Sequence, residues 1–317
     1  MAWGLGLWKG TEFYRWVDDF KPDMILLQCG ESYFMHRMAI SLAKRTGAKL
    51  AIFNTEGFYF FDHDYFVADN RFGKLLFKLY RAISRYNFRR FMARCSKQIY
   101  LNEPLKADHD KALGSRNSIV IYTSSDITPV AKEMSQPPVF SYFGNMGFDR
   151  DRALIEFAEV LSGINQEYVL DVYGFVKSKE MEDRLRACPA IRFHGAVPYD
   201  TVKEVMSKSD FLVHVEGRSE LWAKSLRYGF STKIADSVSS GKIFILYSSP
   251  SIACAEYIIR TKSGIFASTP QELAENIKRA VNDADYAESI RANARIAAAP
   301  ALAEARDGSG STSEKHV

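Results

Sequence analysis

Apolar residues recur along the chain in short continuous runs, and stretches with helical spacing separate these runs. The runs at 23–28 (DMILLQ) and 49–53 (KLAIF) predict buried strands, and the helix-like segment 33–46 between them ends at Gly47. In the second half, strands are expected at 139–143, 168–173, 191–194, 210–215 and 242–247. This alternation with helical segments predicts parallel sheets joined by right-handed crossovers.

The chain length and the prolines predict two domains. A chain of 317 residues with 47% hydrophobic content is large enough for about two hydrophobic cores. Prolines at 129, 137 and 138 mark 126–138 as a linker. We therefore expect an α/β protein with two doubly wound, Rossmann-like domains that face a cleft. They would occupy 1–125 and 139–306, and 307–317 would be a disordered tail.

Cysteine usage and hydropathy exclude several classes of protein. Cys29, Cys95, Cys188 and Cys254 lie far apart without metal-ligand spacing, so we expect free buried thiols and neither a metal nor another cofactor. No apolar run approaches the roughly 18 residues that a membrane span needs. The expected location is the cytoplasm, either in solution or peripheral at the inner face of a membrane.

Basic residues are concentrated in the window 70–100, which contains nine of them and no acidic residue. Aromatic and aliphatic residues are interleaved with helical spacing, which is typical of an amphipathic helix. Such a helix can lie at an anionic membrane or contact a lipid-linked acceptor, with Arg81, Arg85, Arg89 and Arg90 as candidate residues. A core helix with a solvated basic face fits the same pattern. Nucleic acid is disfavoured because no recognition motif accompanies the charge.

The stretch 227–250 places polar groups just before a predicted strand. Ser231 is expected to cap a helix that contains Lys233 and Asp236 and ends near Gly241. The start of a helix suits a diphosphate, because free N–H groups and the helix dipole both favour anions, and Asp236 can accept hydrogen bonds from a ribose. The alternative is an ordinary cap followed by a solvated lysine and a first-turn acid.

This stretch resembles the nucleotide-sugar segment of group 1 glycosyltransferases with the GT-B fold. The family's pattern of an acid, four residues, glycine and lysine appears here as Asp236 to Gly241 and Lys242. The family usually has glutamate at the position of Asp236, and its second glutamate, eight positions earlier, is Tyr228 here. The resemblance extends from 139 to 283. The units that usually begin the family's first domain are absent, so that domain is expected to be shortened.

The resemblance also implies roles for individual residues. The donor diphosphate would contact Arg150, Arg152, Ser231, Thr232 and Lys233. The nucleobase would lie near Gly174, Gly195 and Val197, and the ribose near Asp236. Glu216, at a strand end, would contact sugar hydroxyls. Glu56 follows the strand at 49–53 and is the candidate for contacting the acceptor or the donor sugar, with His63 and Asp64 as alternatives.

The resemblance implies a glycosyltransferase of bacterial surface polysaccharide assembly. It would transfer a sugar from a nucleoside-diphosphate sugar to a glycan or lipid-linked acceptor, with retention of anomeric configuration and without a metal. Cationic side chains and the helix start would then stabilise the leaving group. Two alternatives remain open: a sugar-nucleotide epimerase of the same fold, and a non-catalytic nucleotide-binding remnant.

Overall fold

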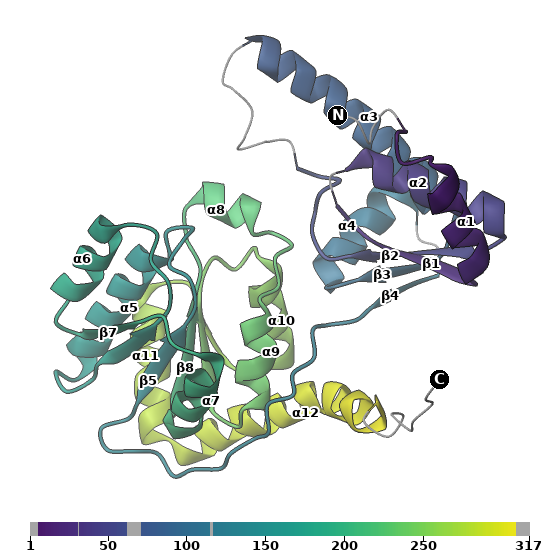
Figure 1. Cartoon of the computed structure of the whole chain (residues 1–317). Helices are drawn as coiled ribbons and strands as arrows, with labels where there is room; N and C mark the ends of the chain where they lie inside the picture. The colour runs from purple at the N-terminus through teal and green to yellow at the C-terminus, as the bar shows by residue number, and fades with distance from the viewer. Residues whose placement is uncertain (1–5, 31, 62–70, 115–116, 309–317) are drawn as a thin grey trace. The chain divides into compact units, whose positions relative to one another are not determined.

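The computed structural model describes residues 6–30, 32–61, 71–114 and 117–308 (Figure 1). Residues His63 and Asp64, and positions 309–317 of the predicted tail, lie outside this part of the chain. The chain divides into two compact units, Met1–Tyr122 and Thr123–Val317. Each unit is built around its own sheet of parallel strands, as the sequence predicts.

The first unit contains a four-stranded sheet whose order, β1-β2-β3-β4, follows the sequence. Every neighbouring pair is parallel, so a helix connects each strand to the next. The elements are α1 (Thr11–Phe20), β1 (Met24–Gln28), α2 (Tyr33–Thr46), β2 (Lys49–Asn54), α3 (Arg71–Met92), β3 (Cys95–Tyr100), α4 (Glu103–Leu113) and β4 (Ser118–Val120).

The basic window 70–100 is a helix followed by a strand. Helix α3 ends at Met92, and β3 begins at Cys95 as an inner strand of the sheet. The interpretation of the window as a single amphipathic helix is therefore wrong for its last six residues. Strand β3 reads CSKQIY and is too polar to stand out as a buried run, because its inward positions include Gln98.

The second unit contains a six-stranded parallel sheet with the order β10-β9-β8-β5-β6-β7. The strands are β5 (Phe140–Phe143), β6 (Leu170–Tyr173), β7 (Ile191–Gly195), β8 (Phe211–Val215), β9 (Ile243–Tyr247) and β10 (Ile265–Ala267). The helices are α5 (Arg150–Ile164), α6 (Lys179–Ala187), α7 (Tyr199–Lys208), α8 (Glu220–Ser225), α9 (Thr232–Ser239), α10 (Ala253–Thr261), α11 (Pro270–Asn282) and α12 (Ala284–Gly308). This is the strand order of a doubly wound sheet.

The core of the second unit forms because its central strands are apolar on both faces. Strands β8 and β9 are buried at every position. Phe140 and Phe211 stack across neighbouring strands with ring centroids 4.6 Å apart. The short apolar runs seen in the sequence are therefore strands covered by helices on both sides.

The segment 121–138 contains no helix or strand and is held against the second unit. Val130 donates its backbone N–H to Ser240, and the buried carboxylate of Asp210 accepts hydrogen bonds from Lys132 and from the backbone of Ser135 and Val139. These bonds fix the entry of the chain into β5.

Two further features concern the cysteines and the helices. The four cysteines are free and buried, as expected. In the described part of the chain, no helix is both long and apolar enough to cross a membrane.

Candidate functional site

The candidate site lies where the strand order of the second sheet reverses. Strands β5 and β8 are neighbours there, although their connections run to opposite sides. Doubly wound sheets bind ligands at the carboxyl ends of the strands at this point. Two loops leave it: Gly144 begins the loop after β5, and Glu216 follows β8 directly.

Arg150 and Glu216 form a buried ion pair across this point. The Nε and Nη2 groups of Arg150 donate to the two carboxylate oxygens of Glu216 over 2.8 and 2.9 Å. A third bond runs from Nη1 to Oδ1 of Asn145, at 2.9 Å. Three of the five guanidinium N–H groups are thereby used, and the pairing fixes the plane of the group.

His214 completes the pair from the same strand. Its Nε2 lies 2.9 Å from Oε1 of Glu216, and both side chains are buried. Burial lowers the pKa of His214, and Arg150 adds to this effect against the opposing pull of Glu216. Burial raises the pKa of Glu216, but the bonds from His214 and Arg150 outweigh it and hold the pKa at about 2. A neutral imidazole therefore donates to an ionised carboxylate.

Lys233 brings a second cation to the site. It makes no hydrogen bond or ion pair with any residue that the structure describes. Burial lowers its pKa and Arg150 lowers it further, while Glu216 and Asp236 act in the opposite direction. A Cβ added to Gly144 would lie 3.0 Å from Nζ of Lys233, so a side chain at this position would crowd the ammonium group.

Helix α9 begins at Thr232, beside this ammonium group, and Ser231 occupies the N-cap position. The predicted side-chain cap is absent, since the Ser231 hydroxyl accepts no cap hydrogen bond. Asp236, one turn into α9, accepts a bond of 2.6 Å from the hydroxyl of Ser125. The segment entering the second unit thus orients the predicted ribose acid.

The predicted nucleobase positions lie at and just beyond the carboxyl ends of the neighbouring strands β6 and β7. Gly174 packs so tightly that an added Cβ would lie 1.6 Å from the carbonyl oxygen of Gly144. Its N–H donates to the carbonyl of Gly195, which has a positive φ of 75° and open space around it. Val197 is half-buried in the loop after β7. Backbone atoms therefore form much of this surface.

Arg152 lies apart from the buried pair. It is two positions beyond Arg150 on α5, which turns it by about 200° around the helix. Its side chain is exposed, whereas Arg150 is buried. The structure therefore brings Arg150 and Lys233 together but leaves Arg152 on the surface.

Glu56 lies at the carboxyl end of β2 in the first unit, as the sequence predicts. It is half-buried, and burial raises its pKa. Cys29 follows the neighbouring strand β1, and burial together with the charge of Glu56 raises the pKa of its thiol to about 12. A partly buried carboxyl group at this edge of the sheet suits contact with a polar ligand.

Three of the four arginines predicted to face a membrane or acceptor instead bind the loop that follows Glu56. Arg81 donates to the carbonyls of Phe58 and Tyr59 at 2.7 and 3.1 Å, and Arg85 donates to the same Tyr59 carbonyl at 3.0 Å. Arg89 donates to the Tyr59 hydroxyl at 2.6 Å. The prediction is wrong for Arg81, which is buried. Arg90 is exposed and lies over the ring of Tyr86.

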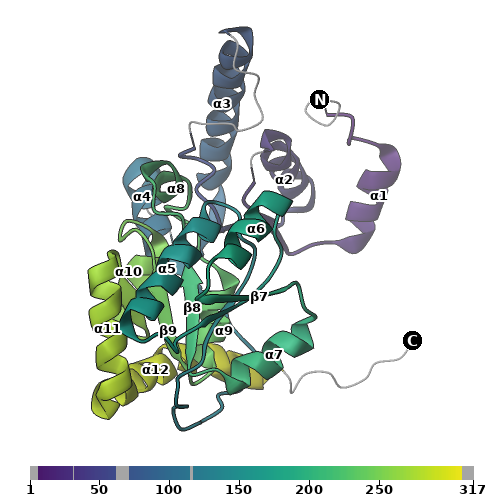
Figure 2. The same ribbon diagram turned by 90° about the vertical axis from the view of Figure 1, so that its left-hand side faces the viewer.

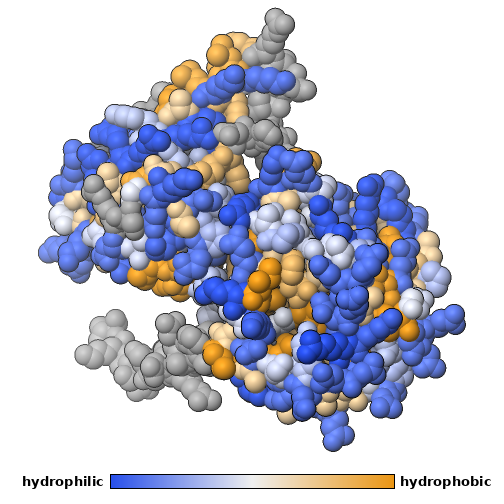
Figure 3. Space-filling view, turned by 180° about the vertical axis from the view of Figure 1, so that it is seen from behind, coloured by the Kyte–Doolittle hydropathy of each residue, from blue (hydrophilic) through white to orange (hydrophobic). Residues whose placement is uncertain are grey.

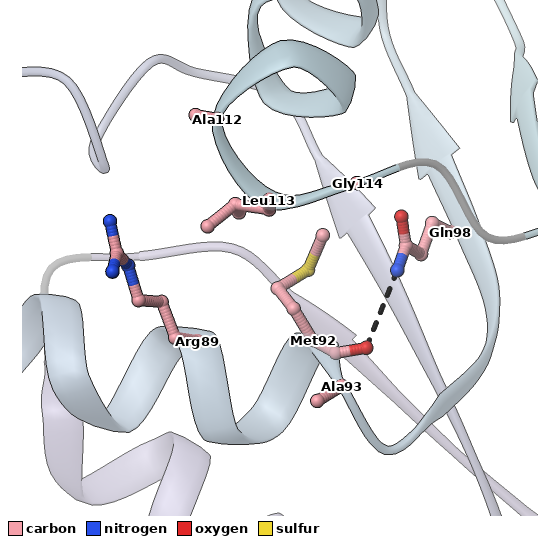
Figure 4. A pocket seen from close by; sticks show the side chains of 7 residues that line it. All are labelled: Arg89, Met92, Ala93, Gln98, Ala112, Leu113 and Gly114. Atoms are coloured by element: carbon pink, nitrogen blue, oxygen red, sulfur yellow. Dashed lines mark hydrogen bonds between the residues drawn. The ribbon is translucent and has the colours of Figure 1, made fainter.

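The first unit contains a hollow of about 200 Å³ (Figure 4). Residues from the end of α3, from β3 and from the end of α4 line it, namely Arg89, Met92, Ala93, Gln98, Ala112, Leu113 and Gly114. It lies beside the amino ends of β3 and β4, because α3 and α4 end just before those strands begin. Ligands of parallel sheets bind at the opposite ends.

Sequence reasoning missed three partners in the candidate site: Asn145, His214 and Ser125. The spacing of His214 and Glu216 was an available signal, because side chains two positions apart on a strand share a face. Ser125 gave no such signal, since its bond to Asp236 joins residues 111 positions apart. Among the described residues, no group of three His, Cys, Asp or Glu side chains has the arrangement of a metal site.

Comparison with known proteins finds a family match within the second unit. Residues 137–283 match the family described as glycosyl transferases group 1. No curated protein matches the chain. The match covers strands β5 to β10 and therefore the whole candidate site at the β5 and β8 ends.

Solved structures share the fold over both units. HepE from Anabaena, in complex with UDP, has 13% sequence identity and a TM-score of 0.60, covering 90% of this chain and 77% of HepE. TarM of S. aureus has 14% identity and a TM-score of 0.57, covering 89% of this chain and 53% of TarM. Sucrose-phosphate synthase from Thermosynechococcus elongatus has 12% identity and a TM-score of 0.57, covering 93% and 75%. The chain thus spans about half of TarM.

Proposed function

Because residues 137–283 match the glycosyl transferases group 1 family and the chain shares its fold with HepE and sucrose-phosphate synthase, we propose that the protein transfers a sugar from a nucleoside-diphosphate sugar to a glycan or lipid-linked acceptor. The transfer proceeds with retention of configuration and without a metal, in polysaccharide assembly at the cytoplasmic face of a membrane. HepE has been solved with UDP and with UDP-glucose, which supports a nucleotide sugar as the donor.

The unpaired ammonium group of Lys233 carries this proposal. Glu216 neutralises Arg150, and the Asp236 carboxylate is bonded to Ser125, so the positive charge of Lys233 has no bonded counter-ion among the residues that the structure describes. A diphosphate supplies that counter-charge. The uncapped start of α9 adds N–H groups and the positive end of a helix dipole.

The same groups stabilise the leaving diphosphate. When the bond between the anomeric carbon and the phosphate oxygen breaks, negative charge develops on the departing phosphate. Lys233 and the start of α9 meet that charge, together with the two N–H groups of Arg150 that Glu216 and Asn145 leave unused. Glu216 acts through Arg150 as a positioning residue, since its oxygens are already bonded.

The remaining polar positions bind the other parts of the donor, and the acceptor. Asp236 binds the ribose hydroxyls in exchange for Ser125, and the loops at Gly174, Gly195 and Val197 contact the nucleobase mainly through backbone atoms. Glu56 contacts the acceptor hydroxyl or the donor sugar from the first unit.

Calorimetric titration with UDP, GDP and their glucose conjugates tests the donor site. We expect one of these nucleotides to bind, and Lys233→Ala to weaken its binding by about tenfold or more, as for a lost charge-assisted bond. Lys208→Ala is the matched control, because Lys208 is an exposed lysine that pairs with Glu204 on α7. The proposal would be contradicted by folded protein that binds none of these ligands. It would also be contradicted by a Lys233→Ala variant that binds the nucleotide as tightly as the native chain.

Turnover is tested separately, with a radiolabelled donor and lipid or glycan acceptors. Release of the nucleotide together with label in the acceptor is the expected result, and product analysis by NMR gives the anomeric configuration. Activity that persists in EDTA supports the metal-independent mechanism. Nucleotide binding without transfer or donor hydrolysis would contradict the enzymatic function while leaving the binding site in place.

A further inference from the structure

Helix α3 exposes a continuous row of large apolar side chains. Their exposed fractions range from 40% to 70%. Successive members lie one, three or four positions apart, which places them within an arc of about 100° around the helix. The apolar face of α3 consists of Phe72, Leu75, Leu76, Leu79, Ile83 and Tyr86.

The opposite side of the same helix faces the first unit. Arg81 lies nine positions from Phe72, or about 180° around the helix, and its side chain is buried against the carbonyls of Phe58 and Tyr59. Phe88 and Phe91 on this side are buried in the core of the unit. Packing therefore fixes the orientation of α3, and the apolar face is the side turned away from the first unit.

Helix α3 projects from the first unit. Figures 1 and 2, which differ by a rotation of 90°, both show its amino-terminal part extending past α2 and α4. In the space-filling view, hydrophobic side chains gather over this projecting end (Figure 3). Contiguous exposed apolar surface of this kind marks a contact site for another surface.

The charge of α3 indicates which kind of surface its apolar face contacts. The helix contains seven basic residues and no acidic one. Lys74, Lys78 and Arg90 are exposed on it. A second copy of the same helix would bring like charges together, whereas an anionic lipid bilayer offers both an apolar interior and negative headgroups. With seven charges among 22 residues, α3 suits a position in the plane of the interface.

We infer that the apolar face of α3 docks the protein on an anionic lipid bilayer, with its leucines inserted and with Lys78 and Arg90 among the headgroups. The inference deepens the proposed function, on which its link to a lipid-linked acceptor rests. The same helix clamps the loop that follows Glu56 through Arg81, Arg85 and Arg89. Docking therefore holds the candidate acceptor residue at a fixed height above the lipid surface.

Co-sedimentation with vesicles tests the docking surface. The native chain is expected to bind vesicles of phosphatidylglycerol with phosphatidylcholine at least about tenfold more tightly than phosphatidylcholine alone, with weaker binding at high salt. The double variant Leu75→Asn and Leu79→Asn is expected to lose about tenfold or more of this affinity. The matched control is Leu221→Asn with Ile259→Asn, since these exposed apolar residues lie on α8 and α10 of the second unit.

Three outcomes overturn the inference. The first is a native chain that does not bind the anionic vesicles, and the second is a variant in Leu75 and Leu79 that binds them like the native chain. The third is a native dimer that this variant converts to a monomer in light scattering, which would assign the face to a second copy. Calorimetric titration with UDP and GDP on the same samples separates failure of docking from failure of the proposed donor site.

Discussion

The guanidinium group of Arg150 and the carboxylate of Glu216 lie face to face at the junction of β5 and β8, joined by two parallel hydrogen bonds of 2.8 and 2.9 Å. Both side chains are buried. Glu216 therefore balances the charge of Arg150 and fixes its orientation, whereas the Lys233 ammonium group has no bonded partner among the described residues.

Loss of Glu216 should destabilise the second unit. Glu216→Leu leaves the Arg150 charge buried without a partner, so the unfolding free energy should fall by about 3–5 kcal/mol. Native-state hydrogen exchange of peptides from β5 and β8 measures it. Adding Arg150→Met should restore part of the loss. Glu182→Gln, which breaks an exposed pair with Arg186, should cost less than about 1 kcal/mol, and an equally small effect of Glu216→Leu would contradict the prediction.

Substitution of Lys233 should weaken nucleotide binding without lowering the stability of the protein. Lys233→Met removes a cation whose charged form is disfavoured by burial and by Arg150, so the ligand-free protein should melt at an unchanged or higher temperature. The increase in melting temperature caused by the bound nucleotide should become clearly smaller at the same nucleotide concentration. Lys132→Met is the contrasting control, because it breaks the pair with buried Asp210 and should lower stability while keeping the nucleotide-induced shift. Thermal scans with and without nucleotide distinguish the two patterns.

The first unit should lose stability in acid because of His36. This side chain is 1% exposed, packs against Phe88, and neither ring nitrogen has a hydrogen-bond partner in the described part of the chain. Burial lowers its pKa from 6.5 to about 4. The unfolded chain therefore binds more protons between these values, and stability falls as the pH drops from 6.5 toward 4. The full loss is about 3 kcal/mol.

Tryptophan fluorescence measures this acid dependence. In a Trp222→Phe background the remaining tryptophans, at positions 3, 8 and 16, all belong to the first unit. His36→Leu should flatten the dependence of unfolding free energy on pH between 4 and 6.5, whereas His194→Asn in the second unit should leave it unchanged. An unaltered slope in His36→Leu would assign the acid sensitivity to other groups.

Gly174 should be intolerant of even a methyl group. Gly174→Ala would place its Cβ on the carbonyl oxygen of Gly144, at a φ of 153°, so the loops after β5 and β6 must separate. We expect a loss of about 2 kcal/mol or more in stability, together with weaker nucleotide binding. Gly163→Ala is the control, because nothing lies within 4 Å of its Cβ position in α5, and it should be neutral or slightly stabilising. Chemical denaturation and calorimetry test both variants.

Much of the fold could be predicted because its strands are short apolar runs. The strand at 49–53 and strands β5 to β9 of the second sheet appear within one or two residues of the predicted positions, since burial on both faces leaves few polar residues in them. Strand β3 escaped prediction because Gln98 and Lys97 interrupt its apolar pattern. Helix α8 escaped because its six residues are too few to show a period.

The site was predictable only where residues adjacent in sequence act together. The neighbourhood of Lys233 and the start of α9 is local, so the stretch itself indicated it. The pairing of Arg150 with Glu216 joins residues 66 positions apart and depends on β5 lying beside β8. The sequence analysis assigned Arg150 to the phosphate and Glu216 to the sugar, and it therefore missed that these two side chains bind each other. In the same way, the sequence did not show that Arg81, which was expected on the surface, is buried and donates to the carbonyl of Tyr59.

The two strand orders imply that the strands of the two sheets pair in a different order during synthesis on the ribosome. In the first sheet each strand pairs with the one made just before it, so its ladder can close progressively as the chain emerges. In the second sheet β5 must wait for β8, because Phe140 pairs with Phe211. At a translation rate of about 5–20 residues per second, that edge stays open for roughly 4–14 s. The strand that later supports the proposed diphosphate site is thus one whose open edge nascent-chain chaperones have reason to shield.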